Sequence, residues 1–253
     1  MVSKNKKRKI CFVITSGIHF SRSKLILREL KARKDIDLKI VLAASAILPT
    51  YSDTLDHMKK EGFICDAQIT MVIEGGTNVA MAKTAGLGII DFATVFENLN
   101  PDIVVLRGDR YEIIAPAVAA AYLNIAIAHI EGGDVTGNID ESVRHAVTKL
   151  SHIHFTTNDL SHKRVLAMGE NPKYVYNVGG PDLELVAKNH YKVSNKLVNF
   201  LGVGDLIDVN RPFIVVMQHP VTSERGRNRK HIEETLHAIH ELKTPTIWFW
   251  PNV

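Results

Sequence analysis

Short apolar runs alternate with amphipathic segments along the whole chain, and this alternation leaves few folds open. The runs are rich in β-branched residues and predict strands that are buried on both faces, whereas the segments between them have the apolar spacing of helices. Strands that alternate with helices build a parallel sheet covered by helices on both faces. We therefore predict an α/β fold. The predicted strands span residues 10–15, 38–44, 69–73, 103–106, 125–130, 153–157, 174–178, 213–217 and 246–250.

A domain boundary is predicted near residue 180. The chain of 253 residues has room for one large domain and part of a second. Gly179, Gly180 and Pro181 interrupt the pattern after the seventh strand, which gives domains at 1–180 and 181–253. Only two strands follow, and two strands with few helices cannot bury a sheet face. We therefore expect the second domain to be incomplete in this chain. The clearest helical patterns span 24–34, 78–99, 111–123, 142–150 and 231–242.

Composition excludes several classes of partner. The net charge is +4, and without interleaved aromatics the basic cluster ahead of the first strand is typical of a solvated terminus. We therefore expect no nucleic acid and no membrane partner. No apolar stretch approaches the roughly 20 residues that span a bilayer. Cys11 and Cys65 lack metal or redox spacing, so we expect reduced thiols in a cytoplasmic protein. The basic cluster consists of Lys4, Lys6, Lys7, Arg8 and Lys9.

Acidic residues follow the fourth and fifth predicted strands, and in an open parallel sheet ligands bind at the carboxyl ends of the strands. Residues 107–110 read Arg-Gly-Asp-Arg. There Asp109 suits electrostatic or base chemistry, or alternatively an ion pair that anchors the loop. In residues 129–134, alternation places His129 and Glu131 on one face of the strand. A general acid or base is favoured for Glu131 over a metal site, which would need a further ligand.

Glycines and a further acid extend this candidate site. Gly132 and Gly133 follow Glu131 and permit close approach of the backbone to a ligand. Asp140 opens the next helix, where it is either a helix cap paired with Arg144 one turn later or a third acid in the same cleft. We expect Asp109, Glu131 and Asp140 to converge, because acids from consecutive strand ends meet at one edge of the sheet.

Two other segments carry weaker signals. Residues 15–24 form a loop of small residues after the first strand, which could offer backbone N–H groups to a phosphate or be an ordinary capped turn. Its sequence matches neither a dinucleotide fingerprint nor a P-loop. His219 follows the strand 213–217 and is a candidate acid, base or phosphate ligand. We interpret His152 and His154, at the start of a strand, as packing or surface residues.

In this order and spacing, the motifs at residues 107–110, 129–134, 139–146 and 218–222 resemble the hydrolysing UDP-N-acetylglucosamine 2-epimerases. The similarity covers nearly the whole chain. It implies a glycosyltransferase-B-like architecture of two Rossmann-like domains, the second incomplete here, with a UDP-sugar bound between them. It also implies release of N-acetylmannosamine and UDP for sialic-acid biosynthesis, with no cofactor and no metal. A homo-oligomer, dimer or tetramer, is implied for the full-length protein.

The resemblance also assigns residues. It implies catalytic roles for Asp109, Glu131, Asp140 and His219. It implies substrate contacts for Arg22, Arg110, Gly132, Gly133, Arg144 and His145.

Two departures from the family pattern widen the range of possible functions. The arginine of the first loop is displaced to Arg22, so a UDP-2,4-diacetamido sugar on the route to legionaminic-type acids is an alternative substrate. The chain also ends before the family's diphosphate-binding segment, so we expect this chain by itself to be inactive. Two more functions stay open, namely a sugar transferase of the same architecture and a non-catalytic UDP-sugar-binding fragment. The set of three acids argues against the transferase.

Overall fold

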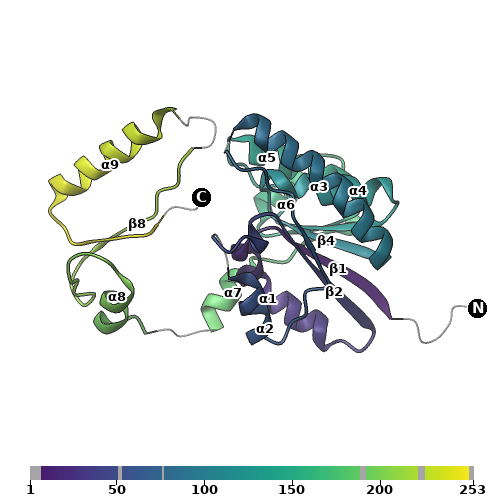
Figure 1. Cartoon of the computed structure of the whole chain (residues 1–253), viewed down its shortest axis with the longest axis horizontal. Coiled ribbons are helices and arrows are strands. Elements are labelled where there is room, and N and C mark those ends of the chain that lie inside the picture. The colour runs from purple at the N-terminus through teal and green to yellow at the C-terminus, as the bar shows by residue number, and fades with distance from the viewer. Residues whose placement is uncertain (1–6, 51–52, 76, 189–191, 222–225, 251–253) are drawn as a thin grey trace, which may run out of the picture. The chain divides into compact units, whose positions relative to one another are not determined.

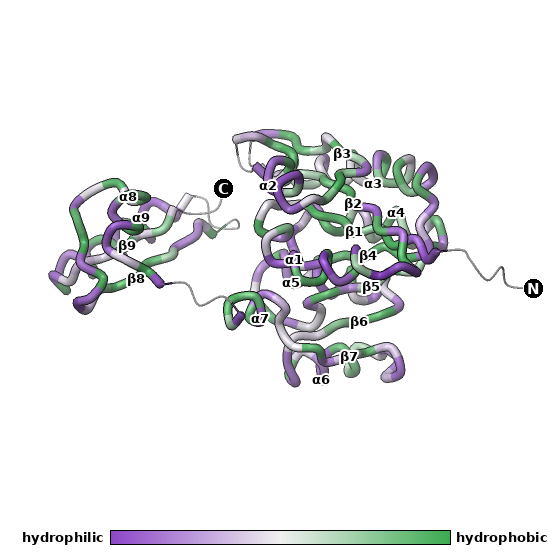
Figure 2. The backbone as a smooth tube through the Cα atoms, turned by 90° about the horizontal axis from the view of Figure 1, so that it is seen from below, coloured by the Kyte–Doolittle hydropathy of each residue, from purple (hydrophilic) through white to green (hydrophobic). Residues whose placement is uncertain are grey.

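The computed structural model describes residues 7–50, 53–75, 77–188, 192–221 and 226–250. The chain separates into two compact units, Met1–Lys188 and Asn189–Val253. The first unit contains a parallel sheet of seven strands in the order β3-β2-β1-β4-β5-β6-β7, which lie side by side in Figure 2. The order reverses between β1 and β4, so the carboxyl ends of these two strands border the crevice where ligands bind in such sheets. The strands are β1 Arg8–Ile14, β2 Ile36–Ala43, β3 Ala67–Ile69, β4 Ile103–Arg107, β5 Ala126–Ile130, β6 Ile153–Thr156 and β7 Val175–Asn177.

Helices cover both faces of this sheet (Figure 1). They are α1 Gly17–Ala32, α2 Thr54–Lys60, α3 Asn78–Leu99, α4 Ile114–Tyr122, α5 Ile139–Leu150, α6 Asp159–Ala167 and α7 Pro181–Lys188. Single 3-10 turns lie at Ala44–Ile47, Tyr111–Ile113 and Pro172–Tyr174. Several helices begin with a polar cap, as at Thr77, whose side chain accepts a hydrogen bond from the N–H of Ala80 and starts α3.

Alternation along each strand divides the core into two layers. In β1, Cys11 and Val13 belong to one buried cluster, whereas Phe12 and Ile14 belong to the other. The first cluster packs under α3 and α4, and the second packs under α1 and α2. Because successive side chains of a strand point to opposite faces, an apolar run without polar positions requires helices on both sides. The prediction of a doubly covered parallel sheet is confirmed.

The element predictions are confirmed in type but differ at several ends. The predicted loop 15–24 is wrong beyond its second residue, because α1 begins at Gly17 with Ser16 as its cap. The cap gives the N–H of His19 an acceptor, so the helix can start seven residues earlier than its apolar spacing indicates. β3 spans Ala67–Ile69 rather than 69–73. The unit boundary falls after Lys188, since α7 packs on α1.

Among the described helices, α3 is the one long and apolar enough to cross a membrane, with a mean hydropathy of 1.5 over 18 residues. The helix meets this criterion by length and composition only. Charged residues interrupt its apolar stretch, namely Lys83, Asp91 and Glu97. Phe92 and Phe96 of this helix lie in the core, while Leu87 and Ile90 are exposed. The high hydropathy of α3 therefore comes from both a core-packing face and an apolar outer face.

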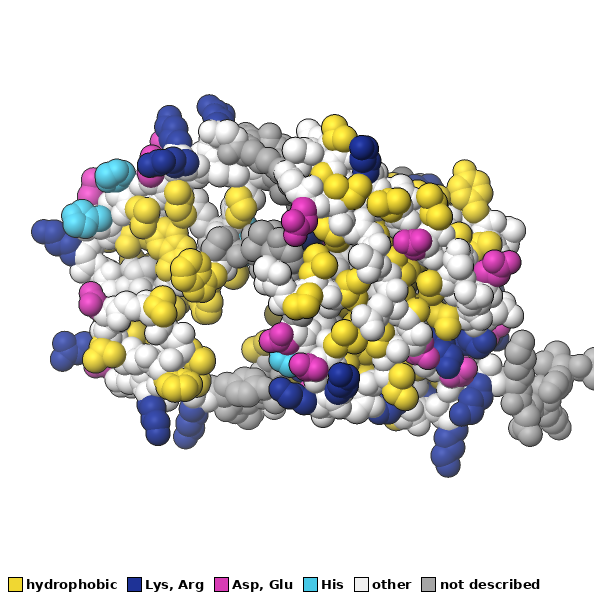
Figure 3. Space-filling view, in the orientation of Figure 1, with side chains coloured by type: hydrophobic (Ala, Val, Ile, Leu, Met, Phe, Trp, Pro, Cys, Tyr) yellow, Lys and Arg dark blue, Asp and Glu magenta, His cyan; other side chains and the backbone are white. Residues whose placement is uncertain are grey.

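The second unit holds α8 Asn195–Leu201, β8 Ile214–Val216, α9 Asn228–Leu242 and β9 Thr246–Trp248. β8 and β9 pair in parallel as a two-stranded sheet. No described residue of this unit is buried, and hydrophobic side chains are visible on its surface in Figure 3. The largest exposed ones include Phe200, Leu206, Met217 and Trp250. Two strands present too little sheet to bury these side chains.

Candidate active site

A cavity of about 300 Å³ lies in the first unit at the carboxyl edge of the sheet. It is bordered by the residues that follow β4, β5, β6 and β7 and by the second turn of α1. The lining residues are Arg22, Gly108, Asp109, Glu131, Asp134, Arg144, Thr157, Gly180, Asp182 and Leu183. The cavity therefore occupies the place where the fold and the strand-end motifs predict a site.

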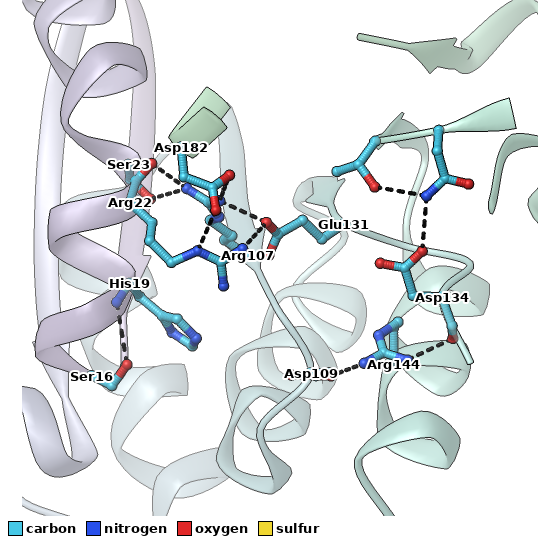
Figure 4. A network of polar contacts seen from close by, with 12 residues as sticks. Ser16, His19, Arg22, Ser23, Arg107, Asp109, Glu131, Asp134, Arg144 and Asp182 are labelled. Carbon is cyan, nitrogen blue, oxygen red and sulfur yellow. Dashed lines mark hydrogen bonds and ion pairs between the residues drawn. The ribbon is translucent and has the colours of Figure 1, made fainter. Parts of the chain in front are cut away.

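Glu131 is the acid at the centre of the charged network in this cavity (Figure 4). Its Oε1 accepts hydrogen bonds from Arg22 at 2.7 Å and from Arg107 at 2.6 Å. Its backbone has a φ of 71°, a left-handed conformation that costs a residue with a side chain about 1–3 kcal/mol. Its N–H donates to the carbonyl of Phe155 on β6 at 2.9 Å, which helps to hold this conformation. Strain of this kind is typical of functional residues.

The left-handed backbone of Glu131 also separates it from His129. Strand alternation predicts that the two side chains share a face, but His129 is fully buried and does not line the cavity. Its ring nitrogens contact the carbonyl of Gly108 at 3.1 Å and the hydroxyl of Thr148 at 3.2 Å. The prediction is wrong because Glu131 lies beyond the strand end, where the period of two no longer holds. Within the described residues, no group of three or more His, Cys, Asp or Glu is arranged to hold a metal ion.

Arg107 is a site residue to which the sequence patterns assigned no role. It is the last residue of β4 and is completely buried. Its guanidinium donates to Glu131, to Asp182 at 3.1 Å, to the hydroxyl of Ser23 at 3.3 Å and to the carbonyl of Arg22. A fully buried cation of this kind ties β4 to α1 and α7 and fixes the carboxylates around it.

Asp182, in the first turn of α7, is a second site residue that the sequence analysis did not identify. Its carboxylate accepts from Nε of Arg22 at 2.9 Å and from Arg107. Burial raises its pKa, but the hydrogen bond from Arg22 and the charges of Arg22 and Arg107 outweigh burial, so the pKa lies below its usual range. One signal was available, since Asp182 follows the Gly-Gly-Pro segment at the end of the seventh strand.

Asp109 and Arg144 form an ion pair on the opposite side of the cavity. Arg144 also donates to the carbonyl of Asp134 at 2.5 Å, and burial followed by the charge of Arg164 lowers its pKa. The alternative pairing of Arg144 with Asp140 is therefore wrong. α5 packs against the 3-10 turn Tyr111–Ile113 that follows the loop after β4, which brings Arg144 within reach of Asp109.

Asp140 does not line the cavity, so the expected convergence of three acids holds for Asp109 and Glu131 only. The side chain that caps α5 is that of Asn138, which accepts from the N–H of Asp140 at 3.1 Å. Asp140 is half-buried, and this burial raises its pKa although the charge of Arg110 opposes the shift. Arg110 itself pairs with the buried Glu112 at 2.7 Å.

Three further candidates lie away from the cavity lining. Gly133 has a φ of +91°, and a Cβ there would lie 2.4 Å from the carbonyl oxygen of Ser161 on α6. A Cβ on Gly132 would lie 2.9 Å from the hydroxyl of Thr148. Close packing of the chain against α5 and α6 therefore favours glycine at both positions, and their contact with substrate stays a prediction. His145 lies on α5, 3.9 Å from Glu141.

His219 follows β8 in the second unit and is exposed. The structure therefore describes its position only within that unit. His154 is buried and contacts Glu170 at 3.2 Å, which confirms its interpretation as a packing residue.

Acid should destabilise the first unit through its buried histidines. Burial lowers the pKa of His129 to about 4, and burial with nearby arginines lowers that of His19 to about 3. Between pH 6.5 and about 4 the unfolded chain takes up protons that the folded chain does not. Stability is therefore complete above pH 6.5 and falls as the pH drops, by about 2 kcal/mol at pH 5 for His129 alone.

Urea unfolding at pH 7 and pH 5 measures this effect. We expect His129→Gln to reduce the difference in unfolding free energy between the two pH values. His57→Gln, at an exposed position on α2, should keep the wild-type difference. An equal pH dependence in all three proteins would contradict the assignment to His129.

Sequence comparisons relate this chain to proteins of known family. Residues 28–253 match the family model described as UDP-N-acetylglucosamine 2-epimerase. The chain is 32% identical over 245 residues to the UDP-N,N'-diacetylbacillosamine 2-epimerase (hydrolyzing) of Legionella pneumophila, covering 97% of this chain and 64% of that protein. It is 29% identical over 249 residues to the GDP/UDP-N,N'-diacetylbacillosamine 2-epimerase (hydrolyzing) of Campylobacter jejuni, covering 96% of this chain and 62% of that protein.

The fold is shared with solved structures. The UDP-GlcNAc 2-epimerase of Neisseria meningitidis, solved with UDP-GlcNAc bound, superposes with a TM-score of 0.78 at 19% identity, covering 95% of this chain and 65% of that one. This chain thus spans less than two thirds of the length of these relatives. With the family model matched over most of its residues, the chain belongs to the UDP-N-acetylglucosamine 2-epimerase family.

Proposed function

We propose that the full-length protein is a hydrolysing 2-epimerase that converts UDP-N-acetylglucosamine and water to N-acetylmannosamine and UDP. The main support for the proposal is the position of Glu131 at the cavity, together with the family to which the chain belongs. One carboxylate oxygen is held by two guanidiniums, and the residue lines a cavity that it shares with Asp109. A positioned carboxylate at the edge of an open cavity is suited to proton transfer.

The chemistry requires such a group because the C2 proton of the sugar is not acidified by a carbonyl. Breaking the C1–O bond sends the electron pair out with UDP and builds cationic character at C1, which acidifies C2–H. Removal of that proton gives a 2-acetamidoglucal. Water then adds its oxygen to C1 and a proton to C2 on the face that inverts the configuration there. The acids of the cavity also stabilise the cationic transition state.

The roles of Glu131 and Asp109 follow from the cavity, and those of the other residues follow from the family resemblance. We assign proton removal to Glu131 and cation stabilisation to Asp109, which Arg144 orients. Asp140, whose pKa burial raises, is suited to supplying a proton in the hydration step. His219 is proposed to assist the leaving diphosphate, and Arg22, Arg110 and His145 to contact the substrate. The absence of a required metal or cofactor, the homo-oligomeric state and the cytoplasmic location remain predictions.

A second substrate is favoured by a specific observation. The relatives from Legionella and Campylobacter act, by their names, on UDP-diacetylbacillosamine, which is a UDP-2,4-diacetamido sugar. Arg22, the arginine of the first loop that is displaced from the family pattern, binds Glu131 and Asp182 in this chain. The same elimination and hydration apply to this sugar, because the substituent at C4 does not take part in them.

Turnover in D₂O without an added acceptor tests the proposal. The full-length protein should release UDP and a free 2-epimerised sugar that carries deuterium at C2, measured by mass spectrometry and proton NMR. Parallel reactions with UDP-N-acetylglucosamine and UDP-diacetylbacillosamine identify the substrate by kcat/KM. Retention of protium at C2 would exclude the elimination. UDP release that depends on an acceptor would indicate a transferase, and binding of UDP without turnover would indicate a binding protein.

A further inference from the structure

Four charged side chains around Glu131 form a balanced cluster of two cations and two anions, which we call the arginine–carboxylate cluster. Its members are Arg22, Arg107, Glu131 and Asp182 (Figure 4). They come from α1, the end of β4, the end of β5 and the first turn of α7. Each guanidinium binds both carboxylates, so neither arginine belongs to one acid alone.

The two oxygens of Glu131 differ in this cluster. Oε1 accepts from both Arg22 and Arg107. No group of the described residues donates a hydrogen bond to Oε2. Glu131 lines the cavity and its Oε1 is occupied, so we infer that Oε2 is the oxygen that a bound substrate meets.

Asp182 explains why the arginines leave Oε2 open. Its Oδ2 holds Nε of Arg22 at 2.9 Å, and its Oδ1 holds the guanidinium of Arg107 at 3.1 Å. These bonds occupy donors that could otherwise reach the second oxygen of Glu131. Arg107 is completely buried and has little freedom to turn, whereas the side chain of Arg22 is 38% exposed. Arg22 is therefore the cation that Asp182 restrains.

We propose that Asp182 is a positioning residue that keeps Arg22 from covering the reactive oxygen of Glu131. This inference rests on the proposed function, in which Glu131 removes the C2 proton. Without the carboxylate at position 182, two cations face one anion, and Arg22 turns its free Nε–H toward Oε2. An oxygen that accepts this N–H is a weaker base and is partly covered, so the chemical step slows while substrate binding is kept.

Three variants of the full-length protein test the assignment. Asp182→Asn should lower kcat by about 100-fold, the lower range for loss of a general base, with KM changed by less than about threefold. Glu184→Gln on the same helix removes an exposed ion pair with Lys188 and should leave kcat unchanged. In the double variant Asp182→Asn with Arg22→Gln the charges balance again. At saturating substrate, where the proposed substrate contact of Arg22 affects KM, kcat should recover at least about tenfold over Asp182→Asn. A loss in KM alone, or a double variant no faster than Asp182→Asn, would overturn the proposal.

A stability measurement on the same proteins is independent of turnover. Asp182→Asn should lower Tm by about 2–4 °C, and adding Arg22→Gln should restore part of this loss, because the surplus cation is gone. The single variant Arg22→Gln completes the cycle, and Tm changes of the two single variants that add up to that of the double variant would show that Asp182 does not balance Arg22 and would overturn the proposal. If the wild-type protein turns over neither UDP-sugar, the proposed function fails. The Tm measurements still decide whether the charge of Asp182 balances that of Arg22.

Discussion

Replacing Glu131 with Gln should lower kcat by about 10³–10⁴-fold, the upper range for loss of a positioned general base. The amide has the size of the carboxylate and can still accept from Arg22 and Arg107 through its oxygen, so the cluster remains assembled. Its nitrogen, however, replaces the open Oε2 and cannot accept a proton. The expected result is a protein that binds UDP-sugar with nearly wild-type affinity but does not exchange the C2 proton.

Steady-state kinetics and deuterium incorporation measure this effect. Glu170→Gln is a suitable control, because Glu170 is also held by a lysine and a histidine but does not line the cavity. That variant should keep kcat within about a factor of two. A Glu131→Gln protein that retains more than about a tenth of the wild-type kcat would remove Glu131 from the chemical step.

Replacing Arg107 with Met should lower the unfolding free energy by about 3–5 kcal/mol, as expected when one partner of a buried ion pair is removed. The change leaves Glu131 and Asp182 with only the partly exposed Arg22 between them. It also removes the donors that join β4 to Ser23 and to the carbonyl of Arg22 on α1. Catalysis should fall as well, since Glu131 loses one of its two holding contacts.

Urea unfolding of the two proteins measures this difference in free energy. Arg107→Lys is informative because it keeps the charge but lacks the fork that serves several acceptors at once, so we expect an intermediate loss. Arg33→Met removes an exposed pair with Asp35 in the same unit and should leave the midpoint unchanged. An Arg107→Met midpoint equal to that of the wild type would mean that the cluster contributes nothing to stability.

The sequence by itself determined that the first unit folds as a parallel sheet with helices on both faces. Periodicity located the described strands of the first unit, although β3 shares only Ile69 with its predicted run, because an uninterrupted apolar run has few ways to be buried other than between two layers of helices. The strand-end rule also placed Asp109 and Glu131 at one edge, since parallel strands end on the same side of a sheet. Arg22 and Arg144 line the same cavity, as their motifs indicated.

Only the tertiary structure decided which charges meet. Arg107 has the position of an ordinary strand end, and the Gly-Gly-Pro segment before Asp182 marks a strand end without indicating which charge Asp182 meets. Arg107 contacts both Glu131 and Asp182 because the ends of β4 and β5 and the start of α7, far apart along the chain, meet around one cavity. Asp140 does not join Asp109 and Glu131 at the cavity for the same reason, because the packing of α5 decides which side chains of its first turn reach the cavity. Side-chain pairing depends on the packing of distant elements, and local patterns carry no information about that packing.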